Sequence, residues 1–186
     1  FIYYACRGCT HSLQNPEELV WAIKKIQEII KNKKFKNKNF LEFGYAHGFT
    51  NTILNKCFNF DKIVSVDIIS TAGQSRDSFF ANLRFKNLTL ICGDSTKKET
   101  VDKASILGPY DFIFIDGGHS EEAAQKDYKL WTQRLNIGGL LAIHDVFPNP
   151  EDGGRPPYNI YLKALASGNF KEIEMIKTLC LLEKIS

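Results

Sequence analysis

The stretch FLEFGYAHGFTN, which runs from Phe40 to Asn51, decides the fold of this chain. Its apolar beginning is typical of a buried β-strand, and its closing Thr-Asn pair begins a helical pattern. Gly44 and Gly48 lie between the two, and they allow positive φ angles and a close approach of a ligand to the backbone. Open α/β sheets form small-molecule crevices where a strand passes through such a turn into a helix.

The chain around this stretch alternates short apolar runs with helical patterns. Such runs predict buried parallel strands, and the short connections between them predict right-handed crossovers. The expected strands are residues 40–43, 62–66, 88–91, 111–115 and 140–143, and the expected helices are residues 50–58, 75–85, 97–107, 121–135 and 158–166. A further helix is predicted from Asn15-Pro16-Glu17-Glu18, where a capping side chain, a proline and two acids suit a helix start.

Two final strands, residues 170–177 and 179–185, are too close in sequence for a crossover and must therefore be antiparallel. We expect an α/β fold, a Rossmann-like doubly wound sheet of seven strands, mostly parallel, closed by an antiparallel C-terminal hairpin. The 186 residues suit a single domain. We divide it into an N-terminal helical segment with a basic linker, a cofactor-binding core, a substrate loop, and a helix with the hairpin, at residues 1–38, 39–146, 147–157 and 158–186.

The composition argues against several classes of protein. Apolar residues make up 44% and charged residues 24%, which is ordinary for a globular chain, and the net charge of +3 is small for a nucleic-acid-binding protein. No apolar run reaches the ~20 residues of a membrane span, and we recognise no signal peptide. Five cysteines without a disulfide framework suit a reducing cytoplasm, and the CxxC pair Cys6 and Cys9 lacks partners for a zinc site.

The lysine-rich run from Lys31 to Lys38 admits two interpretations. It could bind nucleic acid, or it could be the solvated end of a helix, where lysines face the negative end of the dipole. No aromatic ladder accompanies the charge, and this favours the solvated helix end. We therefore expect neither a membrane nor a nucleic-acid partner, and a homo-oligomer stays open.

Aspartate residues follow four of the five parallel strands, namely Asp67, Asp94, Asp116 and Asp145. A single aspartate at a strand end is often a helix cap or a turn former. Because the carboxyl ends of parallel strands meet at one edge of a sheet, four such residues together indicate a ligand site.

The spacing of glycines and acids selects the ligand. Asp67 follows Gly44 by 23 residues, close to the spacing of ~20 at which an acid meets ribose hydroxyls, and Asp94 is suited to accept from an adenine amine. A dinucleotide fold would show GxGxxG and a P-loop would show GxxxxGK[ST], and neither occurs. These absences disfavour an NAD-dependent oxidoreductase and an ATPase. An adenosine ligand without phosphate fits, and S-adenosylmethionine is such a ligand.

Several segments within residues 40–146 carry a family resemblance. LEFGYAHGFT, SVD, GDS, FIFIDGGHS and GGLLAIHDV resemble the ordered motifs of class I S-adenosylmethionine-dependent methyltransferases. The run IDGGHSEEAAQKDYKLWTQRLNIGGLLAIHD is similar to a bacterial subgroup of small-molecule methyltransferases. That subgroup includes macrolide-sugar O-methyltransferases, which use a divalent metal.

The resemblance implies a cofactor site for S-adenosylmethionine. Glu42 would orient the methionine end of the cofactor, Asp67 would bind its ribose, and Asp94 would lie near its adenine. The implied site as a whole comprises Glu42, Gly44, Gly48, Asp67, Ile68, Asp94, Ser95 and Asp116.

The resemblance also implies a catalytic pair and a metal site. Asp116 and Asp145 would ligate Mg²⁺ or another divalent metal, and His119 would be the general base. The metal-dependent relatives carry an acidic pair after the fifth strand, whereas this chain has His144 before Asp145. Mg²⁺ prefers oxygen ligands, so this departure weakens the metal prediction.

We expect an S-adenosylmethionine-dependent methyltransferase that O-methylates a hydroxyl of a small-molecule acceptor. His119 is suited to take the hydroxyl proton, because the ordinary pKa of histidine is about 6.5. Two alternatives stay open: a nucleic-acid methyltransferase that uses the Lys31–Lys38 run, and a catalytically silent module that only binds the cofactor.

Overall fold

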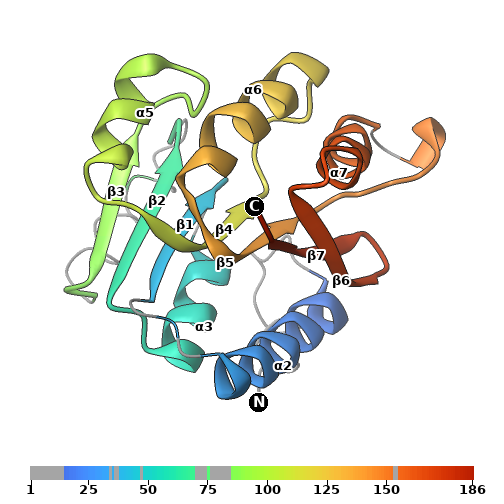
Figure 1. The fold of residues 1–186 in the computed structure, drawn as a ribbon. Coiled ribbons are helices and arrows are strands. Elements are labelled where there is room, and N and C mark those ends of the chain that lie inside the picture. The colour runs from blue at the N-terminus through green and yellow to red at the C-terminus, as the bar shows by residue number, and fades with distance from the viewer. Residues whose placement is uncertain are drawn as a thin grey trace.

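The structure, a computed structural model, describes residues 15–33, 35, 38–46, 48–69, 75, 85–152 and 155–186. Seven strands of these residues form one sheet in the order β3-β2-β1-β4-β5-β7-β6 (Figure 1). The strands are β1 (Asn39–Phe43), β2 (Lys62–Asp67), β3 (Leu88–Cys92), β4 (Tyr110–Ile115), β5 (Leu135–Ile143), β6 (Phe170–Ile176) and β7 (Leu179–Lys184). Strands β1 to β5 are parallel, and β7 pairs antiparallel with both β5 and β6. The predicted fold class is confirmed.

Helices cover both faces of the sheet (Figure 1). One face carries α2 (Pro16–Asn32) and α3 (Phe49–Phe58), and the other carries α5 (Lys98–Ser105), α6 (Glu121–Trp131) and α7 (Pro156–Ala166). Each face has its own apolar cluster, and all five residues of β1 between them are buried. The strand order reverses between β1 and β4, so the crevice of this fold is expected at the carboxyl ends of those strands.

Helix α2 begins as the sequence predicts. The Asn15 side chain accepts a hydrogen bond of 3.0 Å from the backbone N–H of Glu17, and Pro16 opens the first turn. Leu19 and Ile23 of α2 are buried against the sheet. Glu18, in the first turn of the same helix, is also buried. A buried acid at this place needs a partner, and it has one at the strand ends described below.

The predicted helix 121–135 is too long and the predicted strand 140–143 too short. Helix α6 ends at Trp131, a 3₁₀ turn covers Thr132–Arg134, and Leu135 already belongs to β5. The strand continues through Gly138 because a positive φ of 80° there forms a bulge against β4. Gly138 and Gly139 therefore lie within β5 and bend this strand.

The predicted substrate loop 147–157 contains more structure than expected. A 3₁₀ turn covers Pro150–Asp152, and α7 begins at Pro156, two residues before the predicted start, because proline is favoured in a first helical turn. Residues 70–74 and 76–84, where the helix 75–85 was predicted, lie outside the described residues, as do Cys6, Cys9 and residues 34, 36 and 37 of the Lys31–Lys38 run. In the described part of the chain, no helix is both long and apolar enough to cross a membrane.

Candidate active site

A crevice of about 330 Å³ lies at the carboxyl ends of the parallel strands. This volume lies in the range of ~300–1,000 Å³ that is usual for ligand pockets. Six of the predicted cofactor residues line it, namely Gly44, Asp67, Ile68, Asp94, Ser95 and Asp116. Glu42 and Gly48 do not line the crevice.

The glycine turn after β1 lies directly against the turn after β4. Gly44 has a φ of 83°, and a Cβ atom on it would lie 1.9 Å from the carbonyl oxygen of Asp116. Gly48 has a φ of 72°, and its Cβ atom would lie 2.1 Å from the hydroxyl oxygen of Tyr45. Gly44 cannot carry a side chain because the backbone blocks it, whereas a side chain at Gly48 would have to displace the Tyr45 ring in a left-handed conformation that favours glycine.

Glu42 is buried inside the sheet below the crevice. The Ser65 hydroxyl donates a hydrogen bond of 3.1 Å to its Oε2 atom, and the Asn51 amide donates one of 2.9 Å to the Ser65 hydroxyl. Burial raises the pKa of Glu42 to about 8, the hydrogen bond from Ser65 opposes this shift, and the nearby charge of Asp116 adds to it. Burial therefore favours the protonated form of Glu42.

Two of the predicted aspartates are held by backbone amides. The two carboxylate oxygens of Asp67 accept from the N–H of Ala46 at 2.7 Å and from that of Ile69 at 3.1 Å. Asp94 Oδ1 accepts from both the N–H and the hydroxyl of Thr96, and the hydroxyl contact is the main reason why the pKa of Asp94 is lowered. Both side chains are thus held in fixed positions at the crevice wall.

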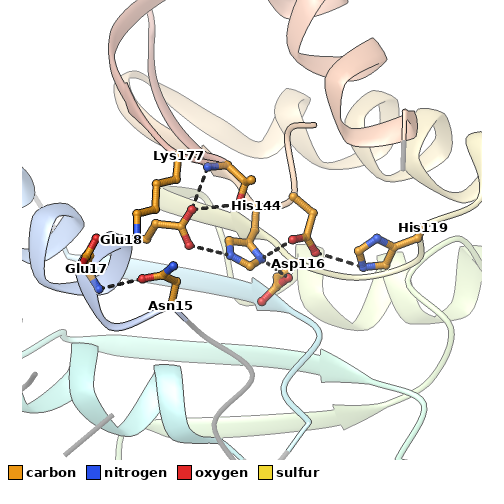
Figure 2. A network of polar contacts seen from close by, with 9 residues as sticks. Asn15, Glu17, Glu18, Asp116, His119, His144 and Lys177 are labelled. Atoms are coloured by element: carbon orange, nitrogen blue, oxygen red, sulfur yellow. Dashed lines mark hydrogen bonds and ion pairs between the residues drawn. The ribbon is translucent and has the colours of Figure 1, made fainter. Parts of the chain in front are cut away.

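A second polar cluster lies where β4 and β5 end (Figure 2). The ring of His144 lies between Glu18 and Asp116, with Nδ1 at 3.0 Å from Asp116 Oδ1 and Nε2 at 3.4 Å from Glu18 Oε2. Nδ1 also lies 3.4 Å from Asp145 Oδ1. Glu18 is itself fixed, because its Oε1 atom accepts from the N–H and the hydroxyl of Thr178, both at 2.8 Å.

The cluster shifts the pKa values of its members. Burial on its own lowers the pKa of His144, but contacts with Asp116, Asp145 and Glu18 outweigh it and raise the pKa to about 12. The His144 hydrogen bond lowers the pKa of Asp145. Burial raises the pKa of Glu18, but hydrogen bonds from His144 and Thr178 outweigh it and lower that pKa. His144 is therefore surrounded by three acidic side chains, and its contacts with them favour the protonated ring.

His119 lies at the solvent side of this cluster. Its Nε2 atom is 3.5 Å from Asp145 Oδ2, and half of its side chain is exposed. It does not cap the next helix, because the Ser120 hydroxyl accepts from the N–H of Ala123 and serves as the N-cap of α6. His119 lines a small pocket that adjoins the crevice and shares Asp116, Gly117 and Gly118 with it.

Asp116, His144 and Asp145 have the donor atoms of a metal site. One ligand atom of each lies within 4.8 Å of the others. Two carboxylate oxygens and one imidazole nitrogen are common ligands of divalent cations. The two aspartates therefore fit a divalent metal, whereas the His144 ring would have to release a proton before its nitrogen could ligate one.

Sequence reasoning missed two buried acids. Glu18 was interpreted as a helix-start acid, although it precedes Ala22 and Ile26 by four and eight residues and so lies on the buried face of α2. Asp127 of α6 is fully buried, and neither of its carboxylate oxygens has a hydrogen-bond partner among the described residues. Burial raises the pKa of Asp127 to about 6.

Comparison with known protein families assigns the chain. A family model described as a methyltransferase domain matches residues 41–146, which is more than half of the sequence. The chain belongs to this methyltransferase family. The match confirms the predicted resemblance to S-adenosylmethionine-dependent methyltransferases, and it covers β1 to β5 with the strand-end residues.

Solved structures share the fold of this methyltransferase domain. A Staphylococcus aureus protein named as a candidate caffeoyl-CoA O-methyltransferase has a TM-score of 0.72 and 15% identity, and the match covers 93% of this chain and 85% of that one. MycE methyltransferase from the mycinamycin biosynthetic pathway, solved with Mg and S-adenosylhomocysteine, has a TM-score of 0.64 and 18% identity over 89% of this chain. The match covers 50% of MycE, so this chain spans about half its length.

A third structure shows how widely the fold is used. An rRNA methylase from Streptococcus thermophilus has a TM-score of 0.61 and 16% identity, with 94% of this chain and 99% of that chain covered. At such identities the likeness concerns the fold alone. The acceptor of the methyl group must be argued from the site.

Proposed function

We propose that this methyltransferase domain transfers a methyl group from S-adenosylmethionine to a hydroxyl group of a small-molecule acceptor. The observation that carries the proposal is the position of His119 and Asp116 beside the crevice that Asp67 and Asp94 line. The names of two structural neighbours, a caffeoyl-CoA O-methyltransferase and a methyltransferase of mycinamycin biosynthesis, support a small-molecule acceptor.

The adenosine part of the cofactor is assigned to the half of the crevice beside β2 and β3. Asp67 would accept hydrogen bonds from the ribose hydroxyls, and Asp94 would accept from the adenine amine. Ile68, whose side chain is exposed at the crevice, would cover one face of the adenine. Gly44 and Gly48 would leave room for the methionine end, with Glu42 behind them.

The reaction is assigned to the half beside β4 and β5. When bound, S-adenosylmethionine supplies a methyl group that its positively charged sulfur already activates. His119 would accept the hydroxyl proton as the new O–C bond forms and the S–C bond breaks, which leaves a methyl ether and S-adenosylhomocysteine. Asp145 beside His119 would stabilise the imidazolium. A divalent ion held by Asp116, His144 and Asp145 would lower the pKa of the hydroxyl.

The proposal is tested by titration calorimetry followed by an acceptor screen. We expect the full chain to bind S-adenosylhomocysteine and to transfer labelled methyl groups to hydroxyl compounds. His119→Ala is expected to lower kcat by ~100-fold or more while cofactor affinity is unchanged, because the residue is assigned to proton transfer. Absence of cofactor binding would refute the proposal. Methyl transfer to RNA, with a steep salt dependence, would show that the acceptor is a nucleic acid and not a small molecule.

A further inference from the structure

We infer that Asp127 of α6 is a positioning residue for the cofactor: it acts through Ser95 and Gly117 in the wall of the crevice, and a proton on its carboxyl group favours the bound state. The inference rests on the proposed function, because it concerns the way in which the same crevice holds an S-adenosyl ligand. It assigns a role to a buried acid that the proposed reaction does not use.

The face of α6 that covers the crevice wall carries Asp127 in its middle. Ala123, Asp127 and Trp131 are four residues apart and therefore lie on one face of the helix. Ala123 lines the crevice, and the indole N–H of Trp131 donates a hydrogen bond of 3.1 Å to the carbonyl oxygen of Ser95. Asp127 thus lies between a residue that lines the crevice and one that is hydrogen-bonded to its wall.

The carboxyl group of Asp127 is close to two residues that line the crevice. A Cβ atom added to Gly117 would lie 3.6 Å from Asp127 Oδ2. Burial raises the pKa of Asp127 to about 6, and the nearby hydroxyl of Ser95 opposes this rise. A change in the charge of this carboxyl group therefore acts on the turn after β3 and on the turn after β4.

Asp127 differs from the other buried acids of the site because it lacks hydrogen bonds. It is fully buried, and neither of its carboxylate oxygens has a hydrogen-bond partner among the described residues. Trp131, one helical turn further on, uses its single N–H for Ser95. A carboxylate that loses its hydration without gaining partners is costly, so the surroundings of Asp127 favour the protonated form.

The groups that face Asp127 from neighbouring elements supply no positive charge. Asp94, in the turn after β3, adds to the effect of burial on the pKa of Asp127. Gly117 in the turn after β4 and Phe43 in β1 lie on either side of the space next to Asp127 Oδ2, and both are uncharged. Repulsion by Asp94 and burial therefore act in the same direction.

The charge of Asp94 is itself stabilised. Hydrogen bonds from Thr96 lower the pKa of Asp94, and the nearby ammonium groups of Lys97 and Lys126 add to this effect. The charged form of Asp94 is therefore favoured at the pH at which Asp127 titrates.

Binding of the cofactor product is expected to strengthen the preference of Asp127 for a proton. A ligand that covers Ser95 and Gly117 removes water from the wall in front of Asp127, and so weakens the screening between Asp127 and Asp94. S-adenosylhomocysteine has no net charge at neutral pH and cannot offset this repulsion. The ligand and the proton then favour the same state, and each strengthens the binding of the other by the same factor.

The test is titration calorimetry of the full chain with S-adenosylhomocysteine at pH 5, 6 and 7. We expect the dissociation constant of the wild type to rise ~5-fold from pH 5 to pH 7, for a proton that the bound state holds ~10-fold more tightly. Asp127→Asn keeps the shape of the side chain and cannot carry the charge, so its affinity should be equal at the three pH values. The range ends at pH 7 because Glu42, with a pKa of about 8, titrates mainly above it.

Glu122→Gln is the matched control, because Glu122 is an exposed acid of the same helix that pairs with Lys126. Its pH profile should equal that of the wild type. A wild-type affinity that does not change with pH would overturn the inference. It would also be overturned if Asp127→Asn lost affinity equally at pH 5 and pH 7 and kept the wild-type profile, since that result indicates a role in packing alone.

Proton uptake provides a measurement that needs no change at Asp127. Heats of binding in buffers of different ionisation enthalpy should show that the wild type takes up about half a proton per ligand at pH 6.5. His119→Ala should take up the same amount, which separates the effect from that histidine. Absence of proton uptake in His119→Ala would overturn the inference even if Asp127→Asn did not fold.

The same titrations separate this inference from the proposed function. A chain that binds S-adenosylhomocysteine with an affinity independent of pH loses the role of Asp127 and keeps the proposed function. A chain that does not bind S-adenosylhomocysteine at any of these pH values loses the proposed function, and the role of Asp127 with it.

Discussion

The candidate site has two halves: the crevice beside β2 and β3, where acids are held by backbone amides, and the adjoining small pocket at the ends of β4 and β5, which is held by side chains from distant parts of the chain. Asp67 and Asp94 accept from amides two residues away, at Ile69 and Thr96, and Asp67 also accepts from the amide of Ala46, 21 positions away. In the other half, Glu18 contacts residues 126 and 160 positions away, His144 and Thr178. The first half depends on local turns and on one contact between the turns that follow β1 and β2, and the second depends on the complete fold.

This difference indicates which half tolerates change. A turn that binds its own carboxylate keeps its shape as long as its few residues are kept. A cluster that joins α2, β4, β5 and the β6–β7 turn loses its shape when any one of these elements moves. Substitutions in the two halves should therefore have effects of different size.

The largest effect is expected where the two halves touch. Gly44→Ala would place a methyl group 1.9 Å from the Asp116 carbonyl oxygen on a backbone with a φ of 83°. We expect a loss of about 4 kcal/mol in the free energy of unfolding, from steric overlap and backbone strain together. Chemical denaturation measures it. Gly168→Ala is the control. Gly168 has a φ of 69°, and a Cβ atom added to it would have no atom of the described residues within 4 Å apart from its chain neighbours, so the variant should lose only about 1 kcal/mol.

Glu18→Ala should have the next largest effect, because it removes the acid that joins the distant elements. His144 and Thr178 would each lose a buried partner, and we expect a loss of about 3 kcal/mol in the free energy of unfolding. The same change at exposed Glu17 should cost no more than about 0.5 kcal/mol. Equal losses in the two variants would show that the reaction half does not depend on α2.

Glu42 lies under both halves and should make stability depend on pH. Its pKa is about 8 in the folded chain against an ordinary value of 4.5, so the folded state binds this proton more tightly. The contribution of this proton to the free energy of unfolding is fully present below about pH 4.5. It is lost as the pH rises to 8, with a slope of about 1 kcal/mol per pH unit. Glu42→Gln should remove this slope. Urea denaturation of both proteins between pH 5 and pH 8 tests it, and identical slopes would contradict it.

Asp67→Ala should have the smallest effect on stability. It deprives two partly accessible amides of their acceptor, and water can replace the carboxylate, so we expect a loss of about 1 kcal/mol. The same variant should weaken binding of S-adenosylhomocysteine, because Asp67 is assigned to the ribose. A stability loss as large as that of Glu18→Ala would remove the proposed difference between the halves.

The parts of this structure that could be predicted are those with local causes. Apolar runs predicted β1 to β4, and the spacing of Gly44 and Asp67 predicted their place at one crevice. The extension of β5 could not be predicted, because Gly138 and Gly139 look like a break until their bulge is paired with β4. The partners of Glu18 could not be predicted either. They lie 126 and 160 positions away in the sequence, and only the folded chain brings α2 next to the C-terminal hairpin.

The contacts of Thr178 predict the order in which parts of the molecule fold. Its carbonyl accepts from the N–H of Val146, and its N–H and hydroxyl hold Glu18, so one residue of the β6–β7 turn connects the beginning of the described chain to the end of β5. During synthesis the turns around Asp67 and Asp94 leave the ribosome long before Thr178 is made. Ribosome-stalled chains of increasing length should therefore gain protease resistance at those turns first. Glu18 and His144 acquire their final arrangement only when the hairpin emerges.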